Sequence, residues 1–139
     1  MYYSGNLKKL LMSLLSIFES DKDGRRKSHI KNLISVAMVD GHLADEEWAL
    51  LSRVAHHLGM SSETIQNIKN NPEEVKFIAP KKYEEKLQQV TDLVAVMMVD
   101  GDVDQKELEL CKKIALKLDL LPRVINDMID NAYHEIKAK

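Results

Sequence analysis

The sequence predicts an all-α domain of about seven helices, and three observations support this prediction. Apolar residues recur at intervals of three and four through most of the chain, which is the spacing of one buried helix face. No useful length of the chain alternates between apolar and polar residues, so strands are not expected. The chain also repeats itself at an offset of sixty residues, which indicates a duplicated structural unit.

The repeat is centred on two acidic turns, Asp40-Gly41 and Asp100-Gly101. Apolar positions match on both sides of these turns without a gap: Leu33 with Leu93, Val36 with Val96, Met38 with Met98, Leu50 with Leu110, Leu58 with Leu118 and Ile65 with Ile125. We therefore expect a single domain over residues 1–139. Its two repeats, at about 25–70 and 81–137, should be related by an approximate two-fold axis, with Met38 and Met98 buried near the centre.

The N-terminal part of the chain is expected to form a separate helix. Leucines at helical spacing predict an amphipathic helix over residues 5–19, and the polar residues that follow predict a loop ending at Gly24. Three helices of the first repeat come next, at about 25–39, 45–58 and 61–70. Gly41 and Gly59 suit the left-handed position that commonly ends a helix, and Ser61 is a good N-cap.

A connecting segment separates the two repeats. Pro72 at a first helical position and Pro80 near the end predict one short helix there. The second repeat then has helices at about 81–99, 105–118 and from Pro122 to the end. Asp119 stands where Gly59 stood, and aspartate is one of the few residues that tolerate the left-handed conformation.

Composition excludes several classes of function. The formal charge of −2, from 20 basic and 22 acidic residues, argues against nucleic-acid binding, which needs a basic surface. The apolar run of the first helix is too short to span a bilayer. Cys111 is the only cysteine and lies on an apolar helical stripe, so we expect a buried thiol and a reducing, cytoplasmic location.

The two acidic turns pose an electrostatic question. Asp40 and Asp100 follow helix C-terminal ends, where a carboxylate is unfavourable by about 0.3 to 1 kcal/mol. Capping is one answer, because the free N–H groups of the next helix can receive a carboxylate. Asp104 with Glu107 fits a capping box, and Glu47 has the matching place in the first repeat.

A hard cation is the other answer. Four carboxylates lie within eight residues of the second turn: Asp100, Asp102, Asp104 and Glu107. Calcium and magnesium prefer such oxygen ligands, although the EF-hand pattern is absent. On the residues alone, capping is favoured over a cation, and both interpretations stay open.

This twice-used pattern resembles the tellurite-resistance TerB-like family. The resemblance rests on an apolar helix, Asp-Gly, a cap, Glu and a Leu-rich helix ending in Leu-Gly, and it covers most of the chain. It implies an all-helical bacterial stress-response domain without catalysis, in which acidic residues bind a metal. The implied metal ligands are Asp40, Glu47, Asp100 and Glu107. His42 and Ala44 depart from the family pattern, which makes the first turn the poorer cation site.

Two classes of function therefore remain. The first is a metal-responsive stress module, and the alternative is a scaffold for protein–protein interaction whose acidic turns are only helix caps. We expect no enzyme, because the chain has no phosphate-binding loop and no nucleophile motif, and its five histidines are scattered. A protein partner or a homodimer is expected under either interpretation.

Overall fold

The computed structural model describes residues 4–101 and 103–138, with side chains at all of these except 4–6, 13–21 and 135–138. Over these residues the chain forms six α-helices and one 3₁₀ helix, with no strand, which confirms the all-α prediction. The elements are α1 (Ser4–Ala37), α2 (Asp45–His57), α3 (Ser62–Asn70), η1 (Pro72–Glu74), α4 (Tyr83–Met98), α5 (Gln105–Lys117) and α6 (Arg123–Ala138).

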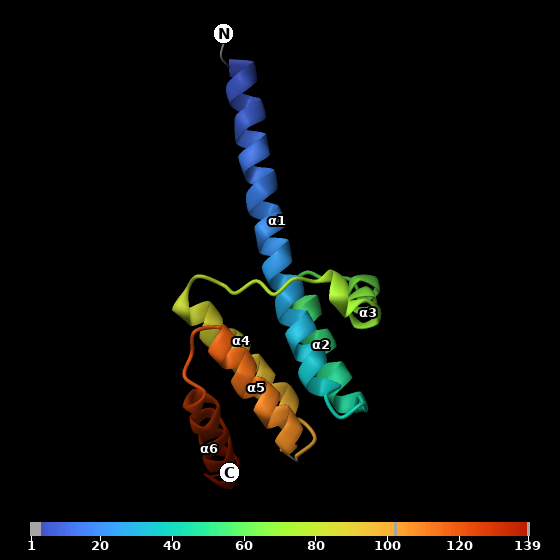
Figure 1. The fold of residues 1–139 in the computed structure, drawn as a ribbon, viewed down its shortest axis with the longest axis vertical. Helices are drawn as coiled ribbons and strands as arrows, with labels where there is room; N and C mark the ends of the chain where they lie inside the picture. The colour runs from blue at the N-terminus through green and yellow to red at the C-terminus, as the bar shows by residue number, and fades with distance from the viewer. Residues whose placement is uncertain (1–3, 102, 139) are drawn as a thin grey trace.

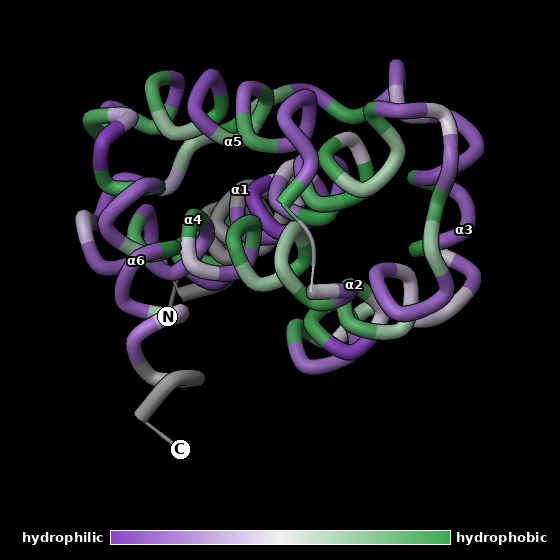
Figure 2. Tube along the Cα trace, turned by 90° about the horizontal axis from the view of Figure 1, so that it is seen from below, coloured by the Kyte–Doolittle hydropathy of each residue, from purple (hydrophilic) through white to green (hydrophobic). Residues whose placement is uncertain are grey.

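The C-terminal half of α1 and the helix α4 form the centre of the bundle. Helix α1 contacts α2, α3, α4 and α5, and α4 contacts α2, α5 and α6. Figure 2 shows α1 nearly end on, with the other helices arranged around it. Four pairs of residues at the sixty-residue offset are fully buried in these two helices: Ile30 with Val90, Leu33 with Leu93, Val36 with Val96 and Ala37 with Met97.

Burial follows the repeat in the outer helices as well. Helices α2 and α5 are each 13 residues long and begin sixty residues apart. Leu51 and Cys111 are both fully buried, as are Ala55 and Ala115. The prediction of a buried thiol is therefore confirmed, whereas the approximate two-fold axis stays a prediction.

The position predicted for two methionines was wrong. Met38 and Met98 are only partly buried, and they pack against the core from its edge. Their neighbours Ala37 and Met97 are the fully buried residues. One residue corresponds to about 100° of rotation on a helix, which is enough to move a side chain from the centre to the border of the buried face.

The predicted loop at residues 19–24 is absent, because α1 runs without a break through this region. A single glycine inside a helix costs only about 1 kcal/mol, which neighbouring turns can offset. Lys27 and Asp23 also form an i,i+4 ion pair, with 3.1 Å between Lys27 Nζ and Asp23 Oδ2. The N-terminal helix predicted over 5–19 is therefore the first half of one helix of 34 residues.

Gly24 has a packing role instead of a turn role. A Cβ atom at this position would lie 2.9 Å from Ile78 Cδ1, in the connecting segment that crosses α1. The same crossing is held by polar contacts: Lys31 Nζ donates to Val75 O at 2.7 Å, and Ile78 N donates to Ser28 Oγ at 2.9 Å. Figure 1 shows this segment passing over α1 between α3 and α4.

The connecting helix is also shorter than predicted. Only Pro72–Glu74 is helical, in a 3₁₀ turn, and the chain then continues without regular structure to the start of α4. The bonds to Ser28 and Lys31 need an irregular backbone whose N–H and carbonyl groups are not consumed within a helix. This requirement explains why the segment leaves helical geometry after Glu74.

The N-terminal part of α1 extends beyond the rest of the bundle (Figure 1). Four large apolar side chains on it are more than half exposed: Leu7, Leu10, Leu11 and Met12. The part of the chain that the structure describes contains no helix long and apolar enough to cross a membrane.

Candidate functional site

Two acidic turns join the central helices to the outer ones and have the same backbone geometry. Gly41 has a φ of 83° and Gly101 a φ of 90°, so both adopt the left-handed conformation predicted for them. Their N–H groups donate to Met38 O at 2.9 Å and Met98 O at 3.0 Å, which closes each helix end. The turns therefore lead from the C-terminal ends of α1 and α4 directly to the starts of α2 and α5.

The two turns differ in how they cap the following helix. Asp104 Oδ1 accepts from Lys106 N at 2.8 Å and from Glu107 N at 3.2 Å, as expected of an N-cap. Ala44 has the same extended backbone but no side-chain cap. In the first turn, Asp40 Oδ1 instead accepts from His42 N at 2.9 Å. Capping thus accounts for Asp104, and a local turn bond accounts for one oxygen of Asp40.

Glu47 and Glu107 behave differently from the other acids of the turns, because both are buried. Their exposed fractions are 3% and 5%, and the two carboxyl groups interact with each other across the bundle. Two carboxylates have no hydrogen between them, so this contact becomes a hydrogen bond only when one of them is protonated. Glu107 therefore turns toward Glu47 and does not serve as the outer half of a capping box.

The electrostatics of this pair favour a bound positive charge. Burial, together with the nearby Glu47, Asp104 and Asp100, raises the pKa of Glu107 to about 8. Burial also raises the pKa of Glu47, with smaller contributions from Asp100 and Asp40, while the contact with Glu107 and a backbone hydrogen bond from Ala44 oppose the rise. A proton or a cation between the two carboxyl groups would relieve this repulsion.

The structure brings some of the predicted ligands together. Asp100 lies close enough to act on both Glu47 and Glu107, Asp40 acts on Glu47, and Asp104 acts on Glu107. Asp102 lies outside the described residues. Within residues 4–101 and 103–138, no group of three or more His, Cys, Asp or Glu side chains is arranged to hold a metal ion. The prediction of a metal site at these residues therefore stays a prediction.

The carboxylate oxygens around Glu47 and Glu107 are ligands of the type that a hard cation prefers. Glu47 Oε2 is buried and has no hydrogen-bond partner, so it is an oxygen that lacks the positive group it needs. The nearby sulfur is not a competing ligand, since burial and the Glu107 charge raise the pKa of the Cys111 thiol to about 12. Oxygen donors without a thiolate favour calcium or magnesium over softer metals.

Comparison with known families agrees with this architecture. Residues 9–70 match the model of the family described as tellurite resistance protein TerB. Residues 9–70, somewhat less than half of the chain, are therefore TerB-like. The matched residues include Asp40 and Glu47 but not the second turn. Asp100 and Glu107 stand sixty positions after Asp40 and Glu47 in the sequence. No curated protein and no solved structure gives a significant match.

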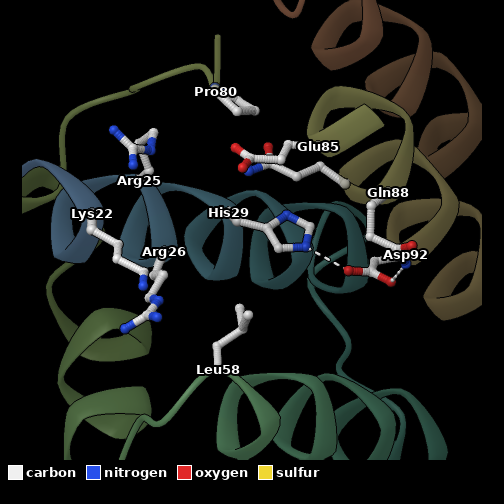
Figure 3. Close-up of a pocket in the computed structure, with 10 residues that line it drawn as sticks. Lys22, Arg25, Arg26, His29, Leu58, Pro80, Glu85, Gln88 and Asp92 are labelled. Carbon is white, nitrogen blue, oxygen red and sulfur yellow. Dashed lines mark hydrogen bonds and ion pairs between the residues drawn. The ribbon is translucent and has the colours of Figure 1, made fainter. Parts of the chain in front are cut away.

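A second polar site, at His29 and Asp92, was not predicted from the sequence. His29 Nε2 lies 2.7 Å from Asp92 Oδ2, and His29 is only 4% exposed. Figure 3 shows this pair at one end of a pocket between α1 and α4. One feature of the sequence indicates that His29 is buried: it shares a helix face with Leu33 and Val36 and must therefore point inward. Its partner on α4 could not be read from the spacing.

Proposed function

We propose that this TerB-like protein is a non-catalytic bacterial stress-response module that acts in the cytoplasm and binds calcium or magnesium between its two acidic turns. The observation that carries the proposal is the buried pair of Glu47 and Glu107, in which Glu47 Oε2 has no partner. One carboxyl group of this pair comes from each repeat. Asp40 and Asp100 add negative charge next to it, which favours a divalent ion.

The residues of the pair would exchange a proton for the ion. Without metal, a proton shared between the two carboxyl groups limits their repulsion, because two buried carboxylates in contact cannot both ionise at low cost. A divalent cation removes the need for that proton and supplies a partner for Glu47 Oε2. The exposed acids of the turns, Asp40 and Asp100, lie near this pair and would add their negative charge to the attraction for the ion.

Isothermal titration calorimetry with calcium and magnesium tests this proposal. Titrations near pH 7 in two buffers of different ionisation enthalpy should show binding with release of up to about one proton. The variant E47Q/E107Q keeps the shape of the pair but loses its charge, so it should bind at least about tenfold more weakly. The matched control is E46Q/E109Q, which changes two neighbouring exposed acids and should bind as the wild type does.

Three results would contradict the proposal. The first is the lack of a binding heat at about 10 mM of either ion, a concentration that reveals even weak affinities. The second is equal binding by E47Q/E107Q and the wild type, which would place the ion elsewhere. The third is equal loss of binding in E46Q/E109Q, which would mean that only the overall charge matters.

An interaction scaffold is the second candidate, and two observations favour it. Asp40 and Asp104 already accept backbone hydrogen bonds, so part of the acidic pattern has a structural use. The projecting end of α1 also carries exposed apolar side chains: Leu7, Leu10, Leu11 and Met12. Apolar side chains grouped on an exposed helix are typical of protein–protein contact, either with another protein or with a second copy of the chain.

A further inference from the structure

The pocket of Figure 3 is a cavity of about 280 Å³ that is separate from the acidic turns. Its walls come from the middle of α1 and the first half of α4, and Leu58 and Pro80 close it on apolar sides. The turns lie at the opposite, C-terminal ends of these two helices. A ligand in this pocket would therefore not touch the carboxyl pair of the proposed cation site.

One wall of the pocket is strongly basic. Lys22, Arg25 and Arg26 lie within two turns of α1 and all line the cavity. Arg25 and Arg26 are partly buried, and no described residue forms an ion pair with either of them. A guanidinium group offers a planar fork of N–H donors that matches a carboxylate or a phosphate. This wall is therefore suited to an oxyanion.

The inner end of the pocket holds a polar atom that lacks a partner. His29 Nε2 is fixed by Asp92 at 2.7 Å, and Asp92 Oδ1 in turn accepts from Gln88 Nε2 at 3.0 Å. A carboxylate only accepts, so His29 Nε2 carries the hydrogen, and Nδ1 is an acceptor whenever the ring is neutral. His29 Nδ1 is buried without any hydrogen-bond partner. A buried acceptor of this kind is destabilising unless a ligand donates to it.

The shape and the lining restrict what the ligand can be. A water molecule takes up about 30 Å³ of the liquid, so the cavity has the volume of about nine waters and fits only a small molecule. Its far wall carries the polar side chains Glu85, Gln88 and Gln89, which can bind hydroxyl or amine groups. The described lining includes no serine, threonine or cysteine. This composition points to binding and not to covalent catalysis.

We propose that this pocket binds a small organic acid, whose phosphate or carboxylate group is held by Arg25 and Arg26. A hydroxyl or amine group of the same molecule donates to His29 Nδ1. The inference does not depend on cation binding at the turns, because it uses different residues and a different ligand chemistry.

Nuclear magnetic resonance titration of the full chain tests the proposal. The probes are glycerol 3-phosphate for a phosphate ester and malate for a hydroxy acid, with glycerol as the neutral control and inorganic phosphate as the oxyanion alone. At least one of the two organic acids should shift the signals of Arg25, Arg26 and His29 at concentrations up to about 10 mM. Glycerol should shift none of them, and inorganic phosphate should bind at least about tenfold more weakly than that acid.

The variant R25Q/R26Q should weaken binding of the same probe at least about tenfold, because it removes both guanidinium groups from a partly exposed wall. Its matched control is K112Q/K113Q on α5, which removes the same charge at residues outside the pocket lining and should change binding less than about twofold. A third variant, H29Q, tests the inner contact. If H29Q does not fold, the comparison of organic acid with inorganic phosphate tests that contact instead.

The proposal is overturned if neither organic acid shifts the pocket signals, or if R25Q/R26Q binds as tightly as the wild type. Equal weakening in K112Q/K113Q would overturn it too, because the effect would then be one of net charge. Equal affinity for inorganic phosphate would also overturn it, because the proposed contact with His29 would then contribute nothing. Cation titrations of these variants should stay unchanged, which separates this result from the test of the acidic turns.

Discussion

Burial of the Glu107 carboxyl group makes the stability of the metal-free protein depend on pH. Its pKa is about 8 in the folded protein and ordinary, near 4.5, in the unfolded chain. Between these values the folded state keeps a proton that the unfolded chain has lost, so the stabilisation is present below the lower value and is lost as the pH rises to the higher one.

The variant E107Q isolates this effect. Between about pH 5 and pH 8, the wild type should lose roughly 2 to 4 kcal/mol more unfolding free energy than E107Q, because a tenfold change in proton affinity corresponds to about 1.4 kcal/mol. Urea denaturation across this pH range measures it. The exposed neighbour variant E109Q should follow the wild type, and an equal pH dependence in E107Q would mean that Glu107 is ionised without cost.

Two glycines of different conformation should respond oppositely to the same substitution. Gly101 has a φ of 90°, which an alanine adopts only with strain, so G101A should lower the unfolding free energy by about 1 kcal/mol or more. Gly24 lies inside α1, and the atom that a new Cβ would meet is the flexible end of a partly exposed Ile78 side chain. G24A should therefore be neutral or stabilising by up to about 1 kcal/mol.

Chemical denaturation of both glycine variants under one condition measures the difference. A raised unfolding midpoint for G101A would contradict the turn geometry. A large loss of stability in G24A would show that the connecting segment cannot adjust to an added methyl group.

At the scale of elements, the starts of α2 and α5 differ by one side chain. Asp104 caps α5 with two backbone hydrogen bonds, whereas Ala44 leaves α2 uncapped with the same extended backbone. A44S should therefore stabilise the protein by about 0.5 to 1 kcal/mol, and D104A should destabilise it by about 0.5 to 2 kcal/mol. Thermal melts of the two variants compare them. An unchanged melting temperature in both would mean that these helix starts do not limit stability.

The elements also show what periodicity can and cannot predict. Apart from the start of the first one, which lies inside α1, the helices of the two repeats were predicted within about two residues, because apolar spacing and the left-handed glycines are local signals. The loop at 19–24 was predicted wrongly because Gly24 was interpreted as a turn signal. In the structure Gly24 lies inside α1 and faces Ile78, more than fifty residues away, and no local pattern contains that contact.

The candidate sites follow the same division. Asp40, Glu47, Asp100 and Glu107 could be named from the two turns, since each stands at a definite place relative to a glycine or a helix start. The contact between Glu47 and Glu107 could not be predicted from the sequence, because it depends on how the two repeats pack together. The contact of His29 with Asp92 was not predicted for the same reason, because the two residues are 63 positions apart in the chain.

At the scale of the whole molecule, the projecting end of α1 should contribute little to the stability of the bundle. Leu7, Leu10, Leu11 and Met12 are more than half exposed, so they bury little apolar area against the rest of the chain. Replacing Leu7 and Leu10 with glutamine should change the unfolding free energy by less than about 0.5 kcal/mol.

The same variant tests the scaffold function, because it removes the apolar surface that a partner would use. If α1 forms a homodimer contact, light scattering should show a dimer in the wild type and a monomer in L7Q/L10Q. The matched control K8Q/K9Q changes two residues at the same level of the helix and should keep the oligomeric state of the wild type. A large loss of stability in L7Q/L10Q without any change of mass would contradict both statements.

The carboxyl pair at the meeting of the two repeats has a kinetic consequence. Glu47 and Glu107 perturb each other only while the halves of the chain are docked, so parting the halves restores ordinary acidity to both groups. Near pH 7, separation of the two halves would release the proton shared by the carboxyl groups. A higher pH would therefore favour separation, and a lower pH would oppose it. Hydrogen exchange of the core amides of α1 and α4 should therefore accelerate with pH by more than the intrinsic chemical exchange rate does. A cation bound at the pair would stabilise the docked halves and slow this exchange.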